Sequence, residues 1–427
     1  MTSTSSPPDP GLHALFDSFS EFGATAGGGV HRLCGSAADG QARDLFAQVV
    51  RDLDGTVRTD AVGNQFGLLA LAGRSDAPLV MLGSHLDSQP QGGRFDGTLG
   101  VASALRVGAA LVRAKAAGTA YAADLCVVNW TNEEGARFRP SLLGSGTYAG
   151  HHRAEAALAI RDDDGVTLAE ALAAIGQRGT DPAPALPACY LELHVEQGTV
   201  LEAAGATIGI VARNWGATKI EAAFIGAQAH TGPCPMDLRR DALLAAAYAI
   251  AEIRAIADRW PGRVHTSVGR IRVDPNSANV VPARVALSVE IRSADDSVLG
   301  EAGALADAAL RAAAERARTG LSIRDRVERP IRPLPEDVCD LVALAAEETG
   351  HRAIRMDTVA GHDALSLLGA CPTGLVFVPS VGGIAHNEAE TTSPADMQAG
   401  LAVLLRAADR LCRAGGEPAR AIRGDAR

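Results

Sequence analysis

The chain has 427 residues, of which 47% are hydrophobic and 21% are charged, and its formal net charge is −10. This length and composition are typical of a soluble globular protein with more than one domain, and the lack of a basic segment argues against a nucleic-acid partner. No apolar run has membrane-spanning length, and the first residues lack the features of a signal peptide, so we expect a cytoplasmic protein without membrane contact. The seven cysteines are scattered, which argues against a disulfide framework and a thiolate zinc site.

Short apolar runs and helical patterns alternate along most of the chain. Strands are predicted at 77–85, 124–134, 190–198 and 373–380, and helices at 100–118 and 394–413. Residues 1–10 and 413–427 lack apolar periodicity, so we expect both ends to be irregular. Strands that alternate with helices predict an α/β fold with a mainly parallel sheet, in which ligands bind at the carboxyl ends of the strands.

The pattern changes between about residues 214 and 329. Strands are predicted at 216–226, 265–274, 284–293 and 320–328, with helices at 239–258 and 299–318. This order, β-α-β-β-α-β, is that of a ferredoxin-like unit. We therefore expect a catalytic domain formed by residues 1–213 and 330–427, interrupted by an inserted domain at 214–329.

Five segments carry His, Asp or Glu among glycines and apolar runs. They are GSHLDSQPQGGRFDG (83–97), TNEEGARF (131–138), ELHVEQG (192–198), GAQAHTGPCPM (226–236) and GGIAHNEAE (382–390). A site that holds two cations and activates water needs ligands of these types. Each segment alone is a weak signal, but all five in this order predict a two-metal hydrolase.

Three residues of the first segment have candidate roles. His85 ends a predicted strand and suits a terminal metal ligand. Asp87 lies on the same side of an extended chain, where its carboxylate could accept the other imidazole N–H. Asp96 lies in a glycine-rich loop that could place a carboxylate between two cations. For an isolated H-x-D pair, the alternative is a structural pair without a metal.

Glu133 and Glu134 follow a predicted strand, and adjacent acids repel each other unless cations neutralise them. One could bind a metal while the other takes a proton from water, and the alternative is a solvated turn. His194 and His386 would supply further nitrogen ligands, although a lone histidine is more often structural.

The inserted segment contributes three further candidates. His230 lies among glycines and prolines and could stabilise an oxyanion, with a turn-capping histidine as the alternative. Arg292 suits bidentate binding of a carboxylate, with Asn279 donating beside it, or it is a surface arginine at a strand end. Outside the insertion, the Gly-His-Asp loop at 361–363 is expected to be structural or to support a ligand.

Together these segments resemble the amidase, hydantoinase and carbamoylase group of the zinc aminoacylase and dipeptidase clan. That group includes N-carbamoyl-L-amino-acid hydrolases, β-ureidopropionases and allantoate amidohydrolases. The resemblance runs from GGVHRLCGS (28–36) through DAVGNQFG (60–67) to HNEAE (386–390). The chain departs from the group after His230, where Thr-Gly-Pro-Cys-Pro replaces the commoner A-G-T-T-P, so the wall of the pocket is expected to differ.

The resemblance implies a role for each candidate residue. One ion would be held by His85, Asp96 and His194, and a second by the bridging Asp96 with Glu134 and His386. Glu133 would be the general base, and Asp87 would orient His85. Substrate would be bound by Gln197, Asn279 and Arg292, with Arg292 at its carboxylate. His230 would act across the interface of a homodimer formed through the inserted domain.

The activity implied is hydrolysis of a linear C–N bond in an N-carbamoyl amino acid, of the L-α or β-alanine type, to the amino acid, CO₂ and ammonia. An allantoate-type or N-acyl-amino-acid amidohydrolase with the same site is the alternative, and a non-catalytic binding protein is a more distant one. Mixed His and carboxylate ligands suit two ions of Zn²⁺, Mn²⁺, Co²⁺ or Ni²⁺ per subunit. The expected partner is a small substrate with a carboxylate.

Overall fold

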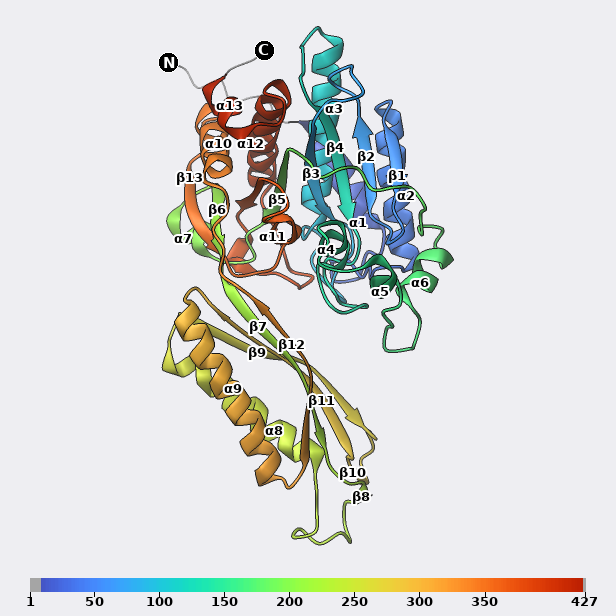
Figure 1. Ribbon diagram of the computed structural model, residues 1–427, viewed down its shortest axis with the longest axis vertical. Coiled ribbons are helices and arrows are strands. Elements are labelled where there is room, and N and C mark those ends of the chain that lie inside the picture. The colour runs from blue at the N-terminus through green and yellow to red at the C-terminus, as the bar shows by residue number, and fades with distance from the viewer. Residues whose placement is uncertain (1–8, 425–427) are drawn as a thin grey trace. The chain divides into compact units, whose positions relative to one another are not determined.

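The computed structural model describes residues 9–424, and the chain divides into two compact units. The first unit comprises Met1–Ala212 and Leu334–Arg427, and the second comprises Arg213–Pro333. Figure 1 shows both units with their elements labelled. Each is described by itself below.

An eight-stranded sheet forms the centre of the first unit, with the order β1-β2-β4-β3-β5-β14-β6-β13. The four central strands, β4-β3-β5-β14, are parallel, while β1, β2 and β6 run antiparallel to their partners. The predicted mainly parallel sheet is therefore confirmed. Its strands are β1 (Thr56–Thr59), β2 (Gln65–Leu69), β3 (Leu79–His85), β4 (Asp124–Trp130), β5 (Cys189–Val195), β6 (Ile208–Asn214), β13 (Ala353–Thr358) and β14 (Thr373–Val378).

Helices α3 and α12 pack against each other and against the parallel strands. Gly100 brings α3 close to β5, because a Cβ at this position would lie 2.3 Å from the Leu193 carbonyl oxygen. The start of α3 is thus held near the end of β5. The longer helices of the unit are α1 (Pro10–Glu21), α2 (Ala37–Asp52), α3 (Thr98–Ala116), α10 (Glu336–Glu348) and α12 (Pro394–Arg413). The shorter ones are α4 (Leu143–Tyr148), α5 (Ala154–Leu158), α6 (Leu168–Ala174), α7 (Val200–Ala204), α11 (Asp363–Leu367) and α13 (Pro418–Arg423).

The chain ends differ from the expectation of irregular structure. Helix α13 occupies 418–423, and Pro418 and Ala421 are buried, so the expectation for 413–427 is wrong over this stretch. A helix of six residues has fewer than two turns, which is too short to show a helical period in the sequence. At the other end, residues 1–8 lie outside the described residues, and α1 begins at Pro10.

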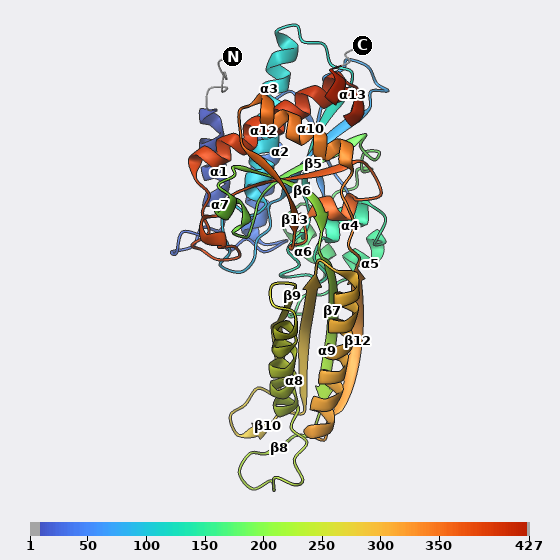
Figure 2. The same cartoon turned by 90° about the vertical axis from the view of Figure 1, so that its left-hand side faces the viewer.

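The second unit has the element order β7-α8-β9-β11-α9-β12 and the antiparallel sheet order β12-β7-β11-β9, which is the ferredoxin-like arrangement. Helices α8 and α9 lie along this sheet (Figure 2). Residues of β11 alternate between buried and half-buried, and the buried hydrophobic residues belong to one core cluster with residues of α8 and α9. The elements are β7 (Gly216–Ile225), α8 (Ala242–Ile256), β9 (Val264–Asp274), β11 (Arg284–Ser293), α9 (Asp296–Arg316) and β12 (Gly320–Arg329), with the short pair β8 (Ala229–His230) and β10 (Val280–Val281).

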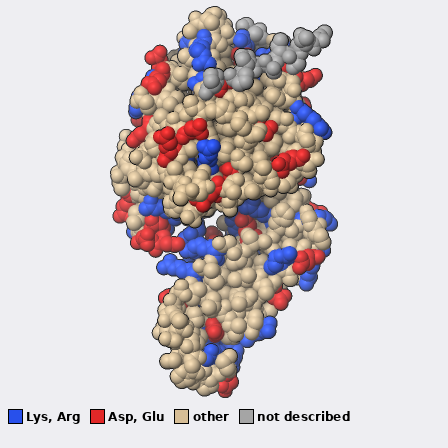
Figure 3. Space-filling model, turned by 180° about the vertical axis from the view of Figure 1, so that it is seen from behind, with Lys and Arg blue, Asp and Glu red and all other residues tan. Residues whose placement is uncertain are grey.

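Two further properties concern the distribution of charge and the polarity of the helices. Acidic and basic side chains are interspersed over the faces of the units drawn in Figure 3. Among the described residues, no helix is both long enough and apolar enough to cross a membrane.

Candidate metal centre

His85 and His194 occupy the same level of two neighbouring parallel strands. The register of β3 and β5 pairs Leu82 with Leu191, and three residues further along each strand are His85 and His194. Each imidazole places Nδ1 2.9 Å from a backbone carbonyl oxygen, that of Asp87 for His85 and that of Val195 for His194. Because a carbonyl only accepts hydrogen bonds, Nδ1 of each ring carries the proton and Nε2 presents a lone pair.

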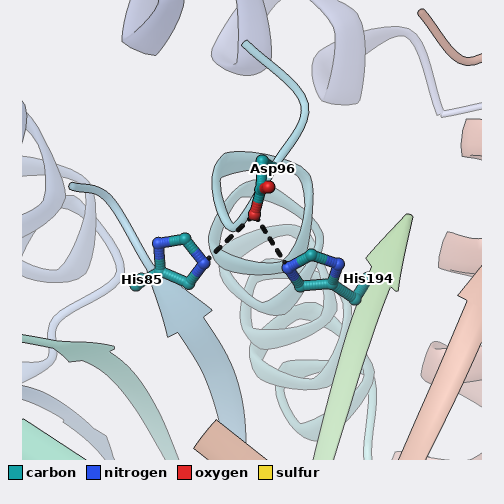
Figure 4. Close-up of side chains that lie close together, drawn as sticks. All are labelled: His85, Asp96 and His194. Atoms are coloured by element: carbon teal, nitrogen blue, oxygen red, sulfur yellow. Dashed lines mark ion pairs between the residues drawn. The ribbon is translucent and has the colours of Figure 1, made fainter. Parts of the chain in front are cut away.

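The two Nε2 atoms converge on one carboxylate oxygen. Asp96 Oδ1 lies 3.3 Å from Nε2 of His85 and 3.1 Å from Nε2 of His194 (Figure 4). Two lone pairs and a carboxylate aimed at one point repel unless a cation or protons lie between them. The three side chains are buried, and Nε2 of His85 has no hydrogen-bond partner among the described residues. Two imidazoles and a carboxylate are a donor set that fits a divalent transition metal.

A second triad shares Asp96. The other oxygen of Asp96, Oδ2, lies 3.3 Å from Nε2 of His386, which is 3.4 Å from Oε2 of Glu134. The Glu134 carboxylate is oriented by Gln89, whose backbone and side-chain amides both donate to it. Each triad brings its ligand atoms within 4.8 Å of one another. A bridging carboxylate between two such triads is the arrangement of a two-metal site.

The loop before α3 depends on glycine to place Asp96. Gly97 has φ +65°, and a Cβ at this position would lie 2.5 Å from the His85 ring. Glycine therefore meets both the backbone conformation and the close approach to the ligand. The Asp96 backbone N–H donates to Oε1 of Glu390 at 3.0 Å, so the segment that carries His386 also fixes the bridging residue.

The protonation of these groups reflects their mutual proximity. Burial disfavours the charged form of His85, but Glu133, Asp96 and Asp87 outweigh it and raise its pKa well above the ordinary value. Burial also disfavours the charged form of Asp96, and the surrounding histidines nevertheless hold its pKa well below the ordinary range. Partial burial lowers the pKa of His386, but Asp96, Glu134 and Glu390 outweigh this effect and raise it to about 9. Cations bound at the triads would replace the protons that the histidines hold in the metal-free protein, because metal ligands must be deprotonated.

Glu133 lies beside the triads without joining them. Its Oε2 is 3.6 Å from Nε2 of His85, and neither triad of described residues that contains Asp96 includes it. Burial raises its pKa well above the ordinary value, and Asp363 and Glu134 add to this effect while His85 opposes it. A carboxylate with raised proton affinity that borders the candidate metal ligands is suited to take up a proton and release it again.

Asp87 acts differently from the expectation. Its carboxylate is 3.9 Å from Nδ1 of His85, and the Nδ1–H group donates to the Asp87 backbone oxygen instead. The carboxylate accepts the backbone N–H groups of Glu133 at 3.1 Å and Glu134 at 3.3 Å. Strand β3 ends at His85, so the strand geometry assumed for Asp87 does not extend to it. Asp87 thus orients the glutamate loop with its side chain and His85 with its main chain.

Two further residues contact the centre in ways that the sequence did not indicate. Gln197, expected to bind substrate, donates from Nε2 to Asp96 Oδ2 at 2.6 Å. Glu192 accepts from the Ser84 hydroxyl and from the Ala364 N–H, each at 2.7 Å, so it joins β3, β5 and α11 beneath the histidines. Its position two residues before His194 in a strand was the available signal, since i and i+2 share a face.

His230, Asn279 and Arg292 belong to the second unit, and their roles toward substrate stay predictions. His230 in β8 pairs with Val280 in β10, and the neighbouring Thr231 N–H donates to the Asn279 carbonyl at 3.2 Å. Arg292 in β11 forms an ion pair with Glu290 at 2.9 Å. His362 of the 361–363 loop is buried in the first unit, and its ring centroid lies 4.4 Å from that of His194, so this loop packs against a candidate ligand.

Comparison with known proteins identifies the family. Residues 81–410 match the model of peptidase family M20/M25/M40. The chain belongs to the M20 peptidase family. It is 37% identical to an N-carbamoyl-L-amino-acid amidohydrolase of Rhizobium meliloti, over 92% of this chain and 94% of the relative. It is 32% identical to an allantoate amidohydrolase of Bacillus subtilis, over 90% of this chain and 93% of the relative.

The solved structures agree with this assignment. A hydantoinase/carbamoylase family amidase from Burkholderia vietnamiensis superposes with a TM-score of 0.90 at 37% identity, covering 96% of this chain and 99% of that one. The M20 family and the amidohydrolase relatives confirm the predicted fold class and the predicted enzyme class, a hydrolase of carbon–nitrogen bonds other than peptide bonds. The donor triads agree with metal dependence.

Proposed function

We propose that this protein is a metal-dependent amidohydrolase that removes the carbamoyl group of N-carbamoyl amino acids, of the L-α or β-alanine type. The observation that carries the proposal is the pair of ligand triads sharing Asp96, with the Glu133 carboxylate beside them. Relatives named N-carbamoyl-L-amino-acid amidohydrolase support the substrate class. An allantoate substrate is the competing candidate, favoured by relatives named allantoate amidohydrolase at 32% and 31% identity.

Two divalent ions per subunit, of Zn²⁺, Mn²⁺, Co²⁺ or Ni²⁺, suit the mixed donor set. The first would be held by His85, Asp96 and His194, and the second by Asp96, Glu134 and His386. When bound, such ions polarise a carbonyl group and lower the pKa of water.

The chain's own residues would move the proton and hold the substrate. Glu133 takes a proton from the water that adds to the ureido carbonyl carbon, and returns it to the leaving nitrogen as the C–N bond breaks. The amino acid leaves, and the carbamic acid that remains decomposes to CO₂ and ammonia, so one water is consumed in total. Asp87 keeps the glutamate loop in place through its two backbone hydrogen bonds.

Substrate recognition would come from residues outside the triads. Arg292 would bind the substrate carboxylate with Asn279 beside it, since a guanidinium suits a carboxylate in bidentate geometry. Gln197, which contacts Asp96, would orient the reacting group. The partner subunit's His230 would stabilise the oxyanion in a homodimer formed through the inserted domain.

A substrate panel tests this proposal. Metal-free protein is supplied with Zn²⁺, Mn²⁺, Co²⁺ or Ni²⁺ and incubated with N-carbamoyl-α-amino acids, N-carbamoyl-β-alanine, allantoate and N-acetyl amino acids, with ammonia and amino acid measured in parallel. We expect turnover of carbamoyl compounds, with ammonia and amino acid in equal amounts. Turnover of allantoate alone would transfer the function to the competing candidate, and no turnover with any metal would overturn the proposal.

A further inference from the structure

Arg32, in the segment 28–36, is fully buried and uses its guanidinium to join three parts of the first unit. Nε donates to the Leu86 carbonyl at 2.5 Å, and one terminal nitrogen donates to the Thr98 hydroxyl at 2.7 Å. The other terminal nitrogen donates to the carbonyls of Phe19 and Phe22, at the end of α1, at 2.6 Å and 3.0 Å. The Phe19 carbonyl also accepts the Phe22 N–H at 3.3 Å, and the negative end of the helix dipole at these carbonyls favours a positive charge.

Two of these contacts reach the segments that carry metal ligands. Leu86 directly follows His85, and Thr98 is the first residue of α3, two positions after Asp96. The Arg32 main chain adds to the first contact, because its N–H donates to the Ser88 hydroxyl and its carbonyl accepts the Ser88 N–H, each at 2.9 Å. The Thr98 N–H in turn donates to the Asp96 carbonyl at 2.6 Å. Arg32 is therefore hydrogen-bonded both to the segment that follows His85 and to the segment that follows Asp96.

The charge of Arg32 is not explained by an ion pair. Among the described residues it forms none, whereas Arg43, also fully buried, pairs with Asp39 at 2.8 Å. Burial lowers the pKa of Arg32 to about 10, against the opposing effect of Asp39 and Asp87, so the guanidinium stays charged at neutral pH. Burying a charge without a direct counter-ion is unfavourable, and a neutral side chain would fill the space at a lower cost. Arginine and lysine are both charged, so what distinguishes arginine at this position is the planar set of N–H donors on its guanidinium.

We propose that Arg32 is a positioning residue of the metal centre, which sets the separation of the His85 and Asp96 ligands by bonding the segments that follow them. The inference rests on the proposed metal site. Lysine at this position has a single ammonium group and cannot reach Leu86, Thr98 and the end of α1 together. Without the several donors of the guanidinium, His85 and Asp96 would still be present, but the distance between their side chains would be less well fixed.

Metal affinity, measured by competition of Co²⁺-loaded protein with a chelator, tests the inference without relying on activity. We expect Arg32→Lys to weaken binding of the ion at His85, Asp96 and His194 by roughly 10- to 100-fold, the range found when the supports of metal ligands are removed. The Co²⁺ absorption bands should shift as well, since they report the ligand geometry. A purely structural role for Arg32 would lower the denaturation midpoint of the metal-free protein and leave the affinity and the spectrum unchanged.

Thr98→Val supplies the second variant, because it removes only the hydroxyl that accepts from Arg32. Ser103→Ala in the same helix is its matched control, since the buried Ser103 hydroxyl has no hydrogen-bond partner among the described residues. We expect about 10-fold weaker binding for Thr98→Val and wild-type binding for Ser103→Ala. If Arg32→Lys does not fold, Thr98→Val decides alone.

The outcomes separate the inference from the proposed function. A wild-type protein that binds Co²⁺ and hydrolyses carbamoyl compounds, with both variants binding as tightly as wild type, would overturn the role of Arg32 and leave the proposed function intact. A wild-type protein that binds no Co²⁺, Zn²⁺ or Mn²⁺ would overturn both.

Discussion

The two triads that share Asp96 are built from different parts of the chain. His85 and His194 are ends of neighbouring parallel strands, and each side chain is 1% exposed. His386 lies in a loop with φ 53°, and its side chain is 49% exposed. Ligands fixed by strand register and by main-chain hydrogen bonds need little reorganisation on binding, whereas a half-exposed loop ligand has to be ordered. The difference predicts that an ion at the first triad would bind more tightly than an ion at the second.

Replacing the residue common to both triads should have the largest effect. Asp96→Asn keeps the shape but removes the charge that faces three histidines, so we expect both ions and all measurable hydrolysis to be lost. Metal content after dialysis, measured by mass spectrometry, checks this. Retention of two ions would show that Asp96 is not a ligand shared by both triads.

The adjacent glutamates form a matched pair of tests. Glu133→Gln should lower turnover by roughly 10²- to 10⁴-fold, the contribution of a general acid–base group, and keep both ions. Glu134→Gln should lose the ion of the second triad. Metal content and turnover measured together on both variants distinguish the two roles. If Glu133→Gln lost an ion, or kept wild-type turnover, its assignment as the proton carrier would fail.

The unequal burial of the histidines predicts unequal affinities. His194→Ala should weaken the first-bound ion by more than the 10- to 100-fold range of supporting residues, and His386→Ala should affect only the second ion. Stepwise titration of metal-free protein with Zn²⁺, followed by calorimetry, resolves the two events. Equal weakening of both steps by either variant would contradict a division of the site into two triads.

The smallest expected effect concerns the pH dependence of the metal-free protein. The pKa of His386 is raised from 6.5 to about 9 by Asp96 and Glu134, against the effect of burial. A raised pKa stabilises the folded state below the ordinary value, and this contribution is lost as pH rises through about 9. We expect the melting temperature in chelator to fall between pH 6.5 and 9, and His386→Gln to reduce that fall. His85 and His194 act in the same direction, so part of the fall should remain.

Sequence periodicity predicted the parts of the fold that depend on regular elements. The apolar runs located β3, β4, β5 and β14, and their ends brought His85 and the glutamate loop to one edge of the sheet. Hydrogen bonds that depend on how the chain turns were not predictable. Asp87 turns its carboxylate to the Glu133 and Glu134 amides, and Gln197 reaches Asp96 through a backbone with φ 59°.

Residues that hold the candidate ligands in position were harder to predict from the sequence than the ligands themselves. Arg32 lies in a segment with no metal-ligand pattern, and its contacts with Leu86 and Thr98 span 54 and 66 residues. Glu390 lies four residues after His386, but only the structure shows that it accepts the N–H groups of Phe95 and Asp96. Helix α13 was missed because its six residues form fewer than two turns, too few to show a helical period. Sequence patterns therefore located the ligands more readily than the groups that hold them.

Anomalous diffraction from crystals of the Zn²⁺-loaded protein would test the central claim most directly. Two zinc peaks about 3.5–4 Å apart, on either side of the Asp96 carboxylate, are the predicted result. One peak should contact His85 and His194, and the other Glu134 and His386. A single peak, or a peak held by Glu192 and His362 beneath the first triad, would contradict a two-metal centre bridged by Asp96.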